Sequence, residues 1–540
     1  MIPAARSRLG LPARLAILGF ALCGEKTFLN LFVDFDRAQA AQGFGAALRV
    51  AQHLSFRFLV AFGAALALLA YVRGWQGLRA TDTAVRAMPM RIGWIVGHFV
   101  LVAALAPLSY LLYRQAATNA SLAAVAMLWT LIAASAALAA LLAMAPLTLW
   151  RDAARTLGVI WWYAAGAALL ATSVMQLAQT LWEPTAALTF ELVRRVLAPI
   201  IPTLAADPVT LVLSTNHFAV QIAEVCSGLE GVGLILAFSC AWLLYFRREY
   251  IFPRALLLIP AGVAASFGLN VLRIATLILI GNAGFPDVAV YGFHSQAGWI
   301  AFIAVACGLV LLSRQSSWFN RSAAYSTASP TMHNPTAVYL MPLLAILAAG
   351  AVSRAFSGSF EFFYPLRVIA GLMMLARYRQ KLAAIDWRCS WRGPAVGVCI
   401  FLVWVIAAHL LLPPGAMPEK LATMPAGLRG FWIVSRIAGS VVMVPIAEEL
   451  AYRGYLMRRW VNSDFESVPF HSVGWLALTV TAVVFGLAHG ALWMPGIVAG
   501  LAYGLLLVRT GRLGEAATAH ATTNALIAAT VLGWNQWQLW

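Results

Sequence analysis

Six polar side chains on three separate apolar stretches form one group that could carry out chemistry. They are Glu448, Glu449, Arg453, His489, His520 and Asn524. Charged side chains are costly at membrane depth, so an ionisable residue on a spanning helix is by default part of a functional site. Two acids, two imidazoles, an amide and a guanidinium therefore predict a catalytic centre inside a bilayer.

Helical spacing gives these side chains different tasks. Glu449 and Arg453 are four residues apart and can pair on one helix face, whereas Glu448 is rotated by about 100° and is free for other work. A carboxylate with a histidine can activate water, and a histidine with an asparagine can bind an oxyanion. A purely structural ion pair, with the histidines as hydrogen-bond partners between helices, is the alternative.

A divalent metal is a competing interpretation of the same residues. One glutamate and two histidines can hold zinc and leave one position open, and the set would be Glu448, His489 and His520. The chain has no HExxH motif, which is the spacing of ordinary zinc proteases. The sequence therefore leaves the need for a metal open.

A second group combines a thiol, a guanidinium and an imidazole, namely Cys226, Arg273 and His294. A basic cluster after the apolar run 228–245 marks its cytoplasmic end, so Cys226 lies at the outer face. The next span rises by about 27 Å from Ala255 to Arg273, and His294 opens the descending span. We expect the three to converge there and to perform acyl transfer, with a thiolate nucleophile and an arginine that stabilises the oxyanion and lowers the thiol pKa.

Composition predicts a polytopic all-α transmembrane bundle. The chain is 62% hydrophobic and 11% charged, and apolar runs of about 20 residues recur along its whole length. The net charge of +17 is expected in cytoplasmic loops, so membrane lipid rather than nucleic acid is the expected partner. The 6 cysteines show no paired spacing that would indicate a disulfide framework or a structural zinc site.

A segment rich in Ser, Thr, Pro and Asn predicts two membrane domains. The expected parts are an unassigned segment 1–50, a first domain 51–315, a linker 316–335 and a second domain 336–540. The interruption 181–225 is too long for a simple connection. Its β-rich runs 209–213 and 217–222 predict a short extracytoplasmic hairpin.

The motifs of the first domain resemble those of the exosortase/archaeosortase family. They are Ala-Glu-Val-Cys226-Ser-Gly, Asn270-Val-Leu-Arg273 and His294-xxx-Gly298, within roughly residues 50–315. The resemblance implies that Cys226 is the nucleophile, Arg273 the substrate or oxyanion stabiliser, and His294 the acid/base. It also implies protein substrates with a C-terminal signal of motif, transmembrane helix and basic tail, and no cofactor for this half.

The motifs of the second domain resemble those of the CPBP (CAAX-processing and bacteriocin-processing) intramembrane proteases. They are Glu448-Glu449-xxx-Arg453, Phe485-xxx-His489 and His520-xxx-Asn524, within about residues 335–535. The resemblance implies that Glu448 and His489 activate water and that Glu449 and Arg453 support the site. His520 and Asn524 would then stabilise the oxyanion.

Together the halves resemble the exosortase E/protease fusions, which are linked to signals of the Val-Pro-Glu-Ile-Asp type. This resemblance implies a multi-pass protein of a bacterial inner membrane that cuts, and transfers, proteins at a sorting signal, with a fused endopeptidase. Two alternatives stay open. The second half could be a non-catalytic module that binds substrate helices, or the protein could be a proton- or ion-coupled transporter.

Overall fold

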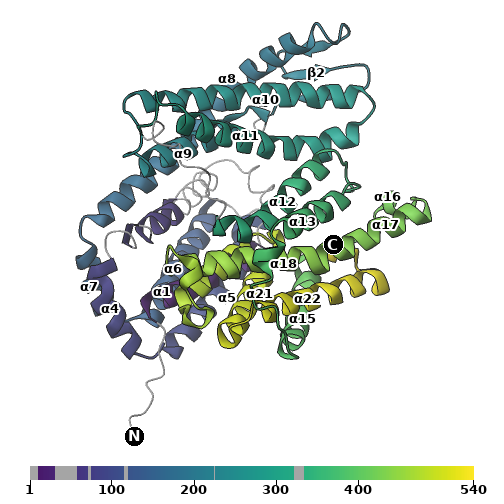
Figure 1. Ribbon diagram of the computed structural model, residues 1–540. Helices are drawn as coiled ribbons and strands as arrows, with labels where there is room; N and C mark the ends of the chain where they lie inside the picture. The colour runs from purple at the N-terminus through teal and green to yellow at the C-terminus, as the bar shows by residue number, and fades with distance from the viewer. Residues whose placement is uncertain are drawn as a thin grey trace. The chain divides into compact units, whose positions relative to one another are not determined.

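The computed structural model describes residues 10–30, 58–67, 69–70, 75–114, 119–223, 226–321 and 334–540. These residues fold almost entirely into α-helices (Figure 1). Among the described helices, eight are long and apolar enough to cross a membrane, and a pair bent by 80°, Leu147–Leu157 with Ile160–Ser173, would make a ninth. The predicted class, a polytopic all-α membrane protein, is confirmed.

The chain forms two compact units, Met1–Gln179 and Thr180–Trp540. The described helices of the first unit include Phe58–Ala67, α1 (Leu11–Asn30), α4 (Trp75–Ala87), α5 (Ile92–Arg114), α6 (Asn119–Met144), α7 (Leu147–Leu157) and the start of α8 (Ile160–Leu197). The domain boundaries expected from composition remain predictions, and residues 322–333 of the expected linker lie outside the described part.

After the end of α8 and a small sheet, the second unit has three neighbouring helices, which carry Arg273 and His294 and follow Cys226 in the chain. They are α9 (Leu229–Tyr245), α10 (Leu258–Asn282) and α11 (His294–Gln315), and α10 packs against both others (Figure 1). The inner face of α10 is apolar: Val271, Ile274 and Ile278 are buried in one hydrophobic cluster. These side chains recur every three or four residues and so form a single stripe of the helix.

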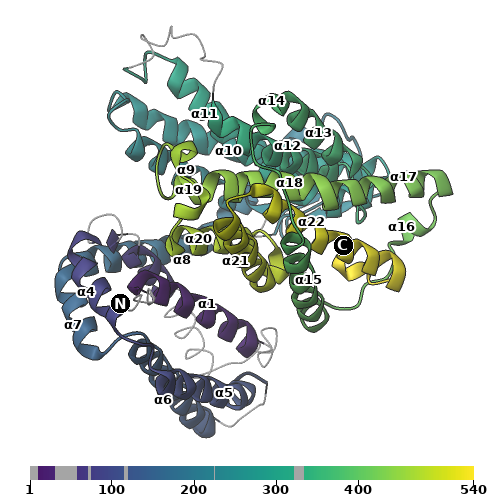
Figure 2. The same cartoon turned by 60° about the horizontal axis from the view of Figure 1, so that its bottom comes forward.

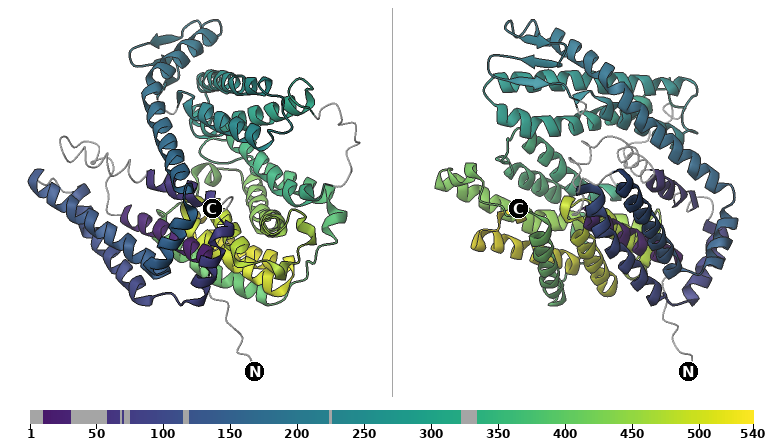
Figure 3. Two further views of the ribbon diagram at one scale, coloured as in Figure 1. Left: turned by 90° about the vertical axis from the view of Figure 1, so that its left-hand side faces the viewer. Right: turned by 180° about the vertical axis from the view of Figure 1, so that it is seen from behind.

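The interruption 181–225 is partly helical, which differs from the expected loop. The helix α8 continues to Leu197, and its charged residues suit a helix because Glu191 pairs with Arg194 at 2.7 Å and with Arg195 at 2.6 Å. The predicted hairpin is present with shorter strands, β2 (Val212–Ser214) and β3 (Ala219–Gln221), and β1 (Ala205–Asp207) adds a third antiparallel strand. The sheet packs beside the end of α8 (Figure 3), with Leu213 in the same core as Leu197.

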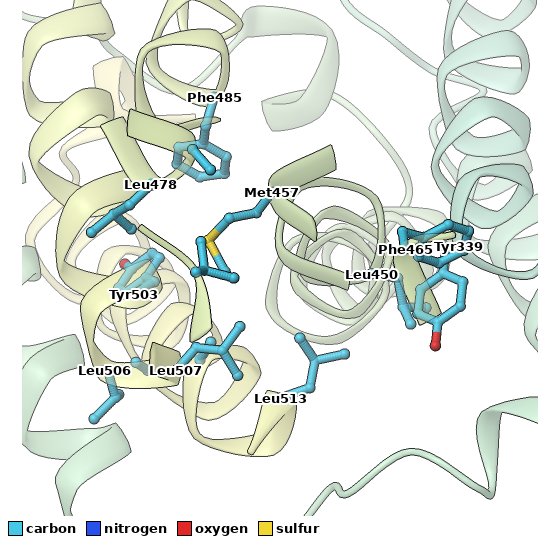
Figure 4. Close-up of a cluster of buried hydrophobic side chains, with 14 of the residues drawn as sticks. Tyr339, Leu450, Met457, Phe465, Leu478, Phe485, Tyr503, Leu506, Leu507 and Leu513 are labelled. Atoms are coloured by element: carbon cyan, nitrogen blue, oxygen red, sulfur yellow. The ribbon is translucent and has the colours of Figure 1, made fainter. Parts of the chain in front are cut away.

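The rest of the second unit is a helical bundle that carries the two-glutamate group (Figure 2). Its long helices are α12 (Pro335–Ala355), α13 (Pro365–Arg377), α15 (Arg392–Leu411), α17 (Ala426–Ile437), α20 (Trp475–Leu487), α21 (Trp493–Thr510) and α22 (Leu513–Trp534). The short helix α18 (Val444–Glu448) comes between α17 and α20 in the chain. Short turns are α14 (Arg379–Leu382), α16 (Glu419–Ala422), α19 (Met457–Arg459) and η11 (Trp537–Leu539). Figure 4 shows the core, where Met457 lies among Leu478, Tyr503 and Leu507.

Three π-helical segments interrupt the helices that carry the candidate residues. They are Val288–Phe293, Ala438–Met443 and Glu449–Leu456. The second precedes Pro445, which has no N–H to donate and whose ring presses on the carbonyl four residues before it. A local widening of the helix relieves such a clash. The chain passes Pro445 within one apolar helical stretch, Ala426–Arg459, which includes this π-helical segment.

Candidate functional site

The loop that carries Cys226 is held by a side chain of α10. Asn270 donates its Nδ2–H to the Cys226 carbonyl oxygen at 3.0 Å, and the Cys226 N–H donates to Ala223 O at 2.9 Å. Gly228, just before α9, has a φ of 87°, and a Cβ there would lie 2.7 Å from Asn270 Nδ2. A glycine is therefore required both by the backbone conformation and by the space that the amide fills.

Arg273 follows Asn270 by one helical turn, and its charge links the other members of the group. The guanidinium acts electrostatically on Cys226 and on His294, and Glu230 acts on the guanidinium. Gly298 on α11 leaves room for it, because a Cβ there would lie 2.8 Å from Nη1. The buried Arg273 Nε has no hydrogen-bond partner among the described residues. A buried N–H donor of this kind can receive an oxygen that becomes charged during a reaction.

The thiol itself is buried, with 6% of the Cys226 surface exposed. Burial raises the pKa of the Cys226 thiol above its ordinary value, while the charge of Arg273 lowers that pKa by a smaller amount. The expected lowering by arginine is present, but burial is the larger effect. The resting thiol is therefore protonated at neutral pH and needs a base to become a nucleophile.

In the group that contains Glu448 and Glu449, one carboxylate bonds to both a guanidinium and an imidazole. Glu449 Oε1 accepts hydrogen bonds from Arg453 Nη1 and from His520 Nδ1, each at 3.0 Å. The Glu449 and Arg453 side chains are 0% and 1% exposed. The Glu449 oxygen that accepts from the guanidinium also faces His520 Nδ1, so the hydrogen bond assigns the His520 proton to Nδ1. The opposite nitrogen, Nε2, is then left to face Glu448 Oε2 at 3.9 Å.

A cavity of about 230 Å³ brings the remaining candidates together. Glu448, His489, His520 and Asn524 all line it. His489 Nδ1 bonds to Phe485 O at 2.8 Å, and Asn524 donates to Ser440 O at 2.7 Å. Glu448 Oε2 has no hydrogen-bond partner within the described chain. The cavity therefore holds a free carboxylate oxygen together with two imidazoles, which is what water activation needs.

Aromatic rings hold these polar groups in place. The Tyr503 ring stacks on His520 with centroids 5.2 Å apart, and its hydroxyl bonds to Thr523 Oγ1 at 2.7 Å. Phe485 lies 4.2 Å from the Arg453 guanidinium carbon. Sequence reasoning did not select Tyr503, nor Arg436 and Trp404, which also line the cavity. Tyr503 and Trp404 occur in apolar runs with no polar spacing that would single them out.

The described residues do not fit a resident metal. No three His, Cys, Asp or Glu side chains in that part of the chain are arranged to hold an ion. His520 is instead bonded to Glu449, and His489 to a backbone carbonyl. The interpretation of Glu448, His489 and His520 as metal ligands stays a prediction for experiment.

Two family models match the chain, one over each group of residues. Residues 49–311 match the model for transmembrane exosortases, and residues 430–526 match the model for type II CAAX prenyl endopeptidases of the Rce1-like kind. Searches of curated proteins and of solved structures gave no significant match. These matches and the apolar helices indicate a multi-pass membrane protein with a protease and protein-sorting function.

Proposed function

Because the chain joins an exosortase-family half to a CAAX-protease-family half, we propose that it removes C-terminal sorting signals from membrane-tethered proteins and transfers the new carboxyl end to an acceptor. A second, intramembrane endopeptidase reaction belongs to the CAAX-type half. The proposed location is a bacterial inner membrane. The proposed substrates end in a short motif of the Val-Pro-Glu-Ile-Asp type, an apolar helix and a basic tail.

The first reaction is acyl transfer by a cysteine. His294 takes the proton of the Cys226 thiol, and the sulfur bonds to the carbonyl carbon of the scissile peptide. The resulting oxyanion is stabilised by the Arg273 guanidinium. When the C–N bond breaks, the protonated His294 gives its proton to the leaving amine. An amine acceptor or water then attacks the thioester, and the thiol is regenerated.

The second reaction is hydrolysis by an activated water. Glu448 takes one proton from a water molecule that His489 helps to activate in the cavity, and the hydroxide adds to a peptide carbonyl. His520 and Asn524 stabilise the oxyanion, while Glu449 and Arg453 hold His520 in position. Collapse of the intermediate breaks the C–N bond and passes a proton to the leaving amine.

The observation that carries the first proposal is the buried, unpartnered Nε–H of Arg273, on a residue whose charge acts on both Cys226 and His294. The second proposal, hydrolysis by an activated water, rests on the cavity that is lined by Glu448 and both histidines. Both observations support a nucleophile or base that acts together with a donor group, as acyl transfer and peptide hydrolysis require.

The test is to express the full chain with a reporter that ends in motif, helix and basic tail, and to follow the reporter's mass. Cys226→Ala is expected to leave the signal attached, whereas Glu448→Ala still removes it. Glu448→Ala should abolish a different cut, in the reporter or in its released signal. If Cys226→Ala still removes the signal, the thiol assignment is wrong for this substrate.

A further inference from the structure

The exosortase-type half and the protease-type half touch backbone to backbone inside the compact unit Thr180–Trp540. The closest approach is at Gly292, where an added Cβ would lie 1.8 Å from Ser357 O and 2.7 Å from Arg354 O. Both carbonyls belong to the C-terminal end of α12 and the turn after it. Figure 1 shows α11 and α12 as neighbours. No side chain fits at this position, so glycine allows the contact.

A second set of contacts lies a few residues earlier in the chain. Asp287 accepts hydrogen bonds from the Ser359 N–H at 3.3 Å and pairs with Lys420 of α16. A Cβ on Gly358 would lie 2.0 Å from Asp287 Oδ2, so Gly358 leaves the space that this carboxylate occupies. Glycines on both halves thus lie at the contact, together with one ion pair and a backbone hydrogen bond.

The segment held in this way lies between two of the three proposed exosortase residues. It connects α10, which carries Arg273, to α11, whose first residue is His294. Asp287 directly precedes the π-helical segment Val288–Phe293, Gly292 lies within it, and the segment ends directly before His294. π-helical turns are rare overall and are frequent at functional sites. Contacts at Asp287 and Gly292 therefore hold the turn that leads into His294.

We propose that the protease-type half positions His294 of the exosortase-type half through this contact, so that Asp287 and Gly292 are positioning residues for the sorting reaction. The inference rests on the proposed role of His294. The protease-type half then contributes to the geometry of the Cys226 site, in addition to carrying the Glu448 site. The cavity that holds Glu448 is lined by residues other than Asp287, Gly292 and Lys420.

The first experiment compares Gly292→Ala with Gly308→Ala in the full chain. Gly308 is on the same helix as His294, and an added Cβ there meets nothing within 4 Å. A displacement of about 1 Å at a catalytic group costs about 10²-fold in rate. Gly292→Ala is therefore expected to lower kcat for signal removal by about 10²-fold, with KM nearly unchanged. Gly308→Ala should behave as wild type, and the Glu448-dependent cut should persist in both.

The second experiment uses the ion pair, in case Gly292→Ala does not fold. Asp287→Lys and Lys420→Asp are each expected to slow signal removal, and the double variant should recover part of the lost kcat. Wild-type kcat in Gly292→Ala, or no recovery in the double variant, would overturn the inference. Cys226→Ala is run in parallel: if it still removes the signal, the proposed function has failed, whereas its inactivity beside a fully active Gly292→Ala refutes only the positioning role.

Discussion

Replacing Glu449 with glutamine tests the network of the second site most directly. Glu449→Gln keeps the size and shape of the side chain and removes its charge. Both native contacts, from Arg453 Nη1 and from His520 Nδ1, are made to Oε1 at 3.0 Å. A glutamine with its carbonyl oxygen in that place keeps both acceptor contacts but no longer supplies the counter-charge of Arg453. Its amide group then replaces Oε2, which has no hydrogen-bond partner among the described residues.

The expected loss follows from burial. Arg453 is 1% exposed and has Glu449 as its counter-charge at 3.0 Å. Leaving one member of a buried ion pair without its counter-charge costs about 3–5 kcal/mol, and we expect the low end, about 3 kcal/mol, because glutamine still accepts both hydrogen bonds. A His520 ring that donates to a neutral amide instead of a carboxylate should lower the Glu448-dependent cut by at least about 10²-fold, which equals about 2.7 kcal/mol of transition-state stabilisation.

The chain offers a matched control on α22. Glu515 is also 1% exposed, but its Oε2 accepts a backbone N–H, that of Gly393, at 3.1 Å. Glu515→Gln keeps an acceptor oxygen there and should cost about 1 kcal/mol, with cleavage unchanged. Denaturant titration in micelles, monitored by tryptophan fluorescence, gives the free energy of unfolding. Equal losses in both variants, or full cleavage by Glu449→Gln, would refute the role given to this network.

Three further outcomes are expected at the two sites. Because burial raises the pKa of Cys226, the thiolate forms only above the ordinary thiol range; alkylation by iodoacetamide should keep rising with pH there, and Arg273→Leu should move the curve to still higher pH. A curve at or below the pH of a free thiol would contradict this. Asn270→Leu leaves the Cys226 carbonyl unsatisfied, at a cost of about 1–3 kcal/mol, and should slow signal removal about tenfold; unchanged kcat would argue against its positioning role. Treatment with 1,10-phenanthroline should leave the Glu448-dependent cut intact, whereas a loss that zinc restores would favour the metal interpretation.

Much of the second site could be predicted from spacing alone. The pairs Glu449–Arg453 and His520–Asn524 each lie one helical turn apart, so their shared faces follow from helix geometry. The bond between Glu449 and His520 joins positions 71 residues apart, and nothing local in the sequence encodes it. The motif order suggested that these residues meet, but the partner of each oxygen required the packed helices.

The fold was predicted well where a stretch is apolar and less well where it is charged. The segment around Glu191 was expected to be a loop because it is charged, yet the charges pair along the helix α8. The roles of Asn270 and Tyr503 were missed for a different reason. Each acts through one contact with a distant part of the chain, Cys226 O for Asn270 and the His520 ring for Tyr503, and such contacts leave no periodic pattern.

The three π-helical segments have a consequence for how this protein tolerates changes in length. A π-helical turn corresponds to an α-helix with one residue added. Deleting a single codon within Val288–Phe293 would let the backbone return to α-helix, which keeps the register of the flanking turns and removes the local widening before His294. A deletion between Glu449 and Arg453 would leave these two residues three positions apart instead of four. Changes in length therefore alter the backbone beside the candidate residues more than substitutions do, so related chains should hold the lengths of these segments constant.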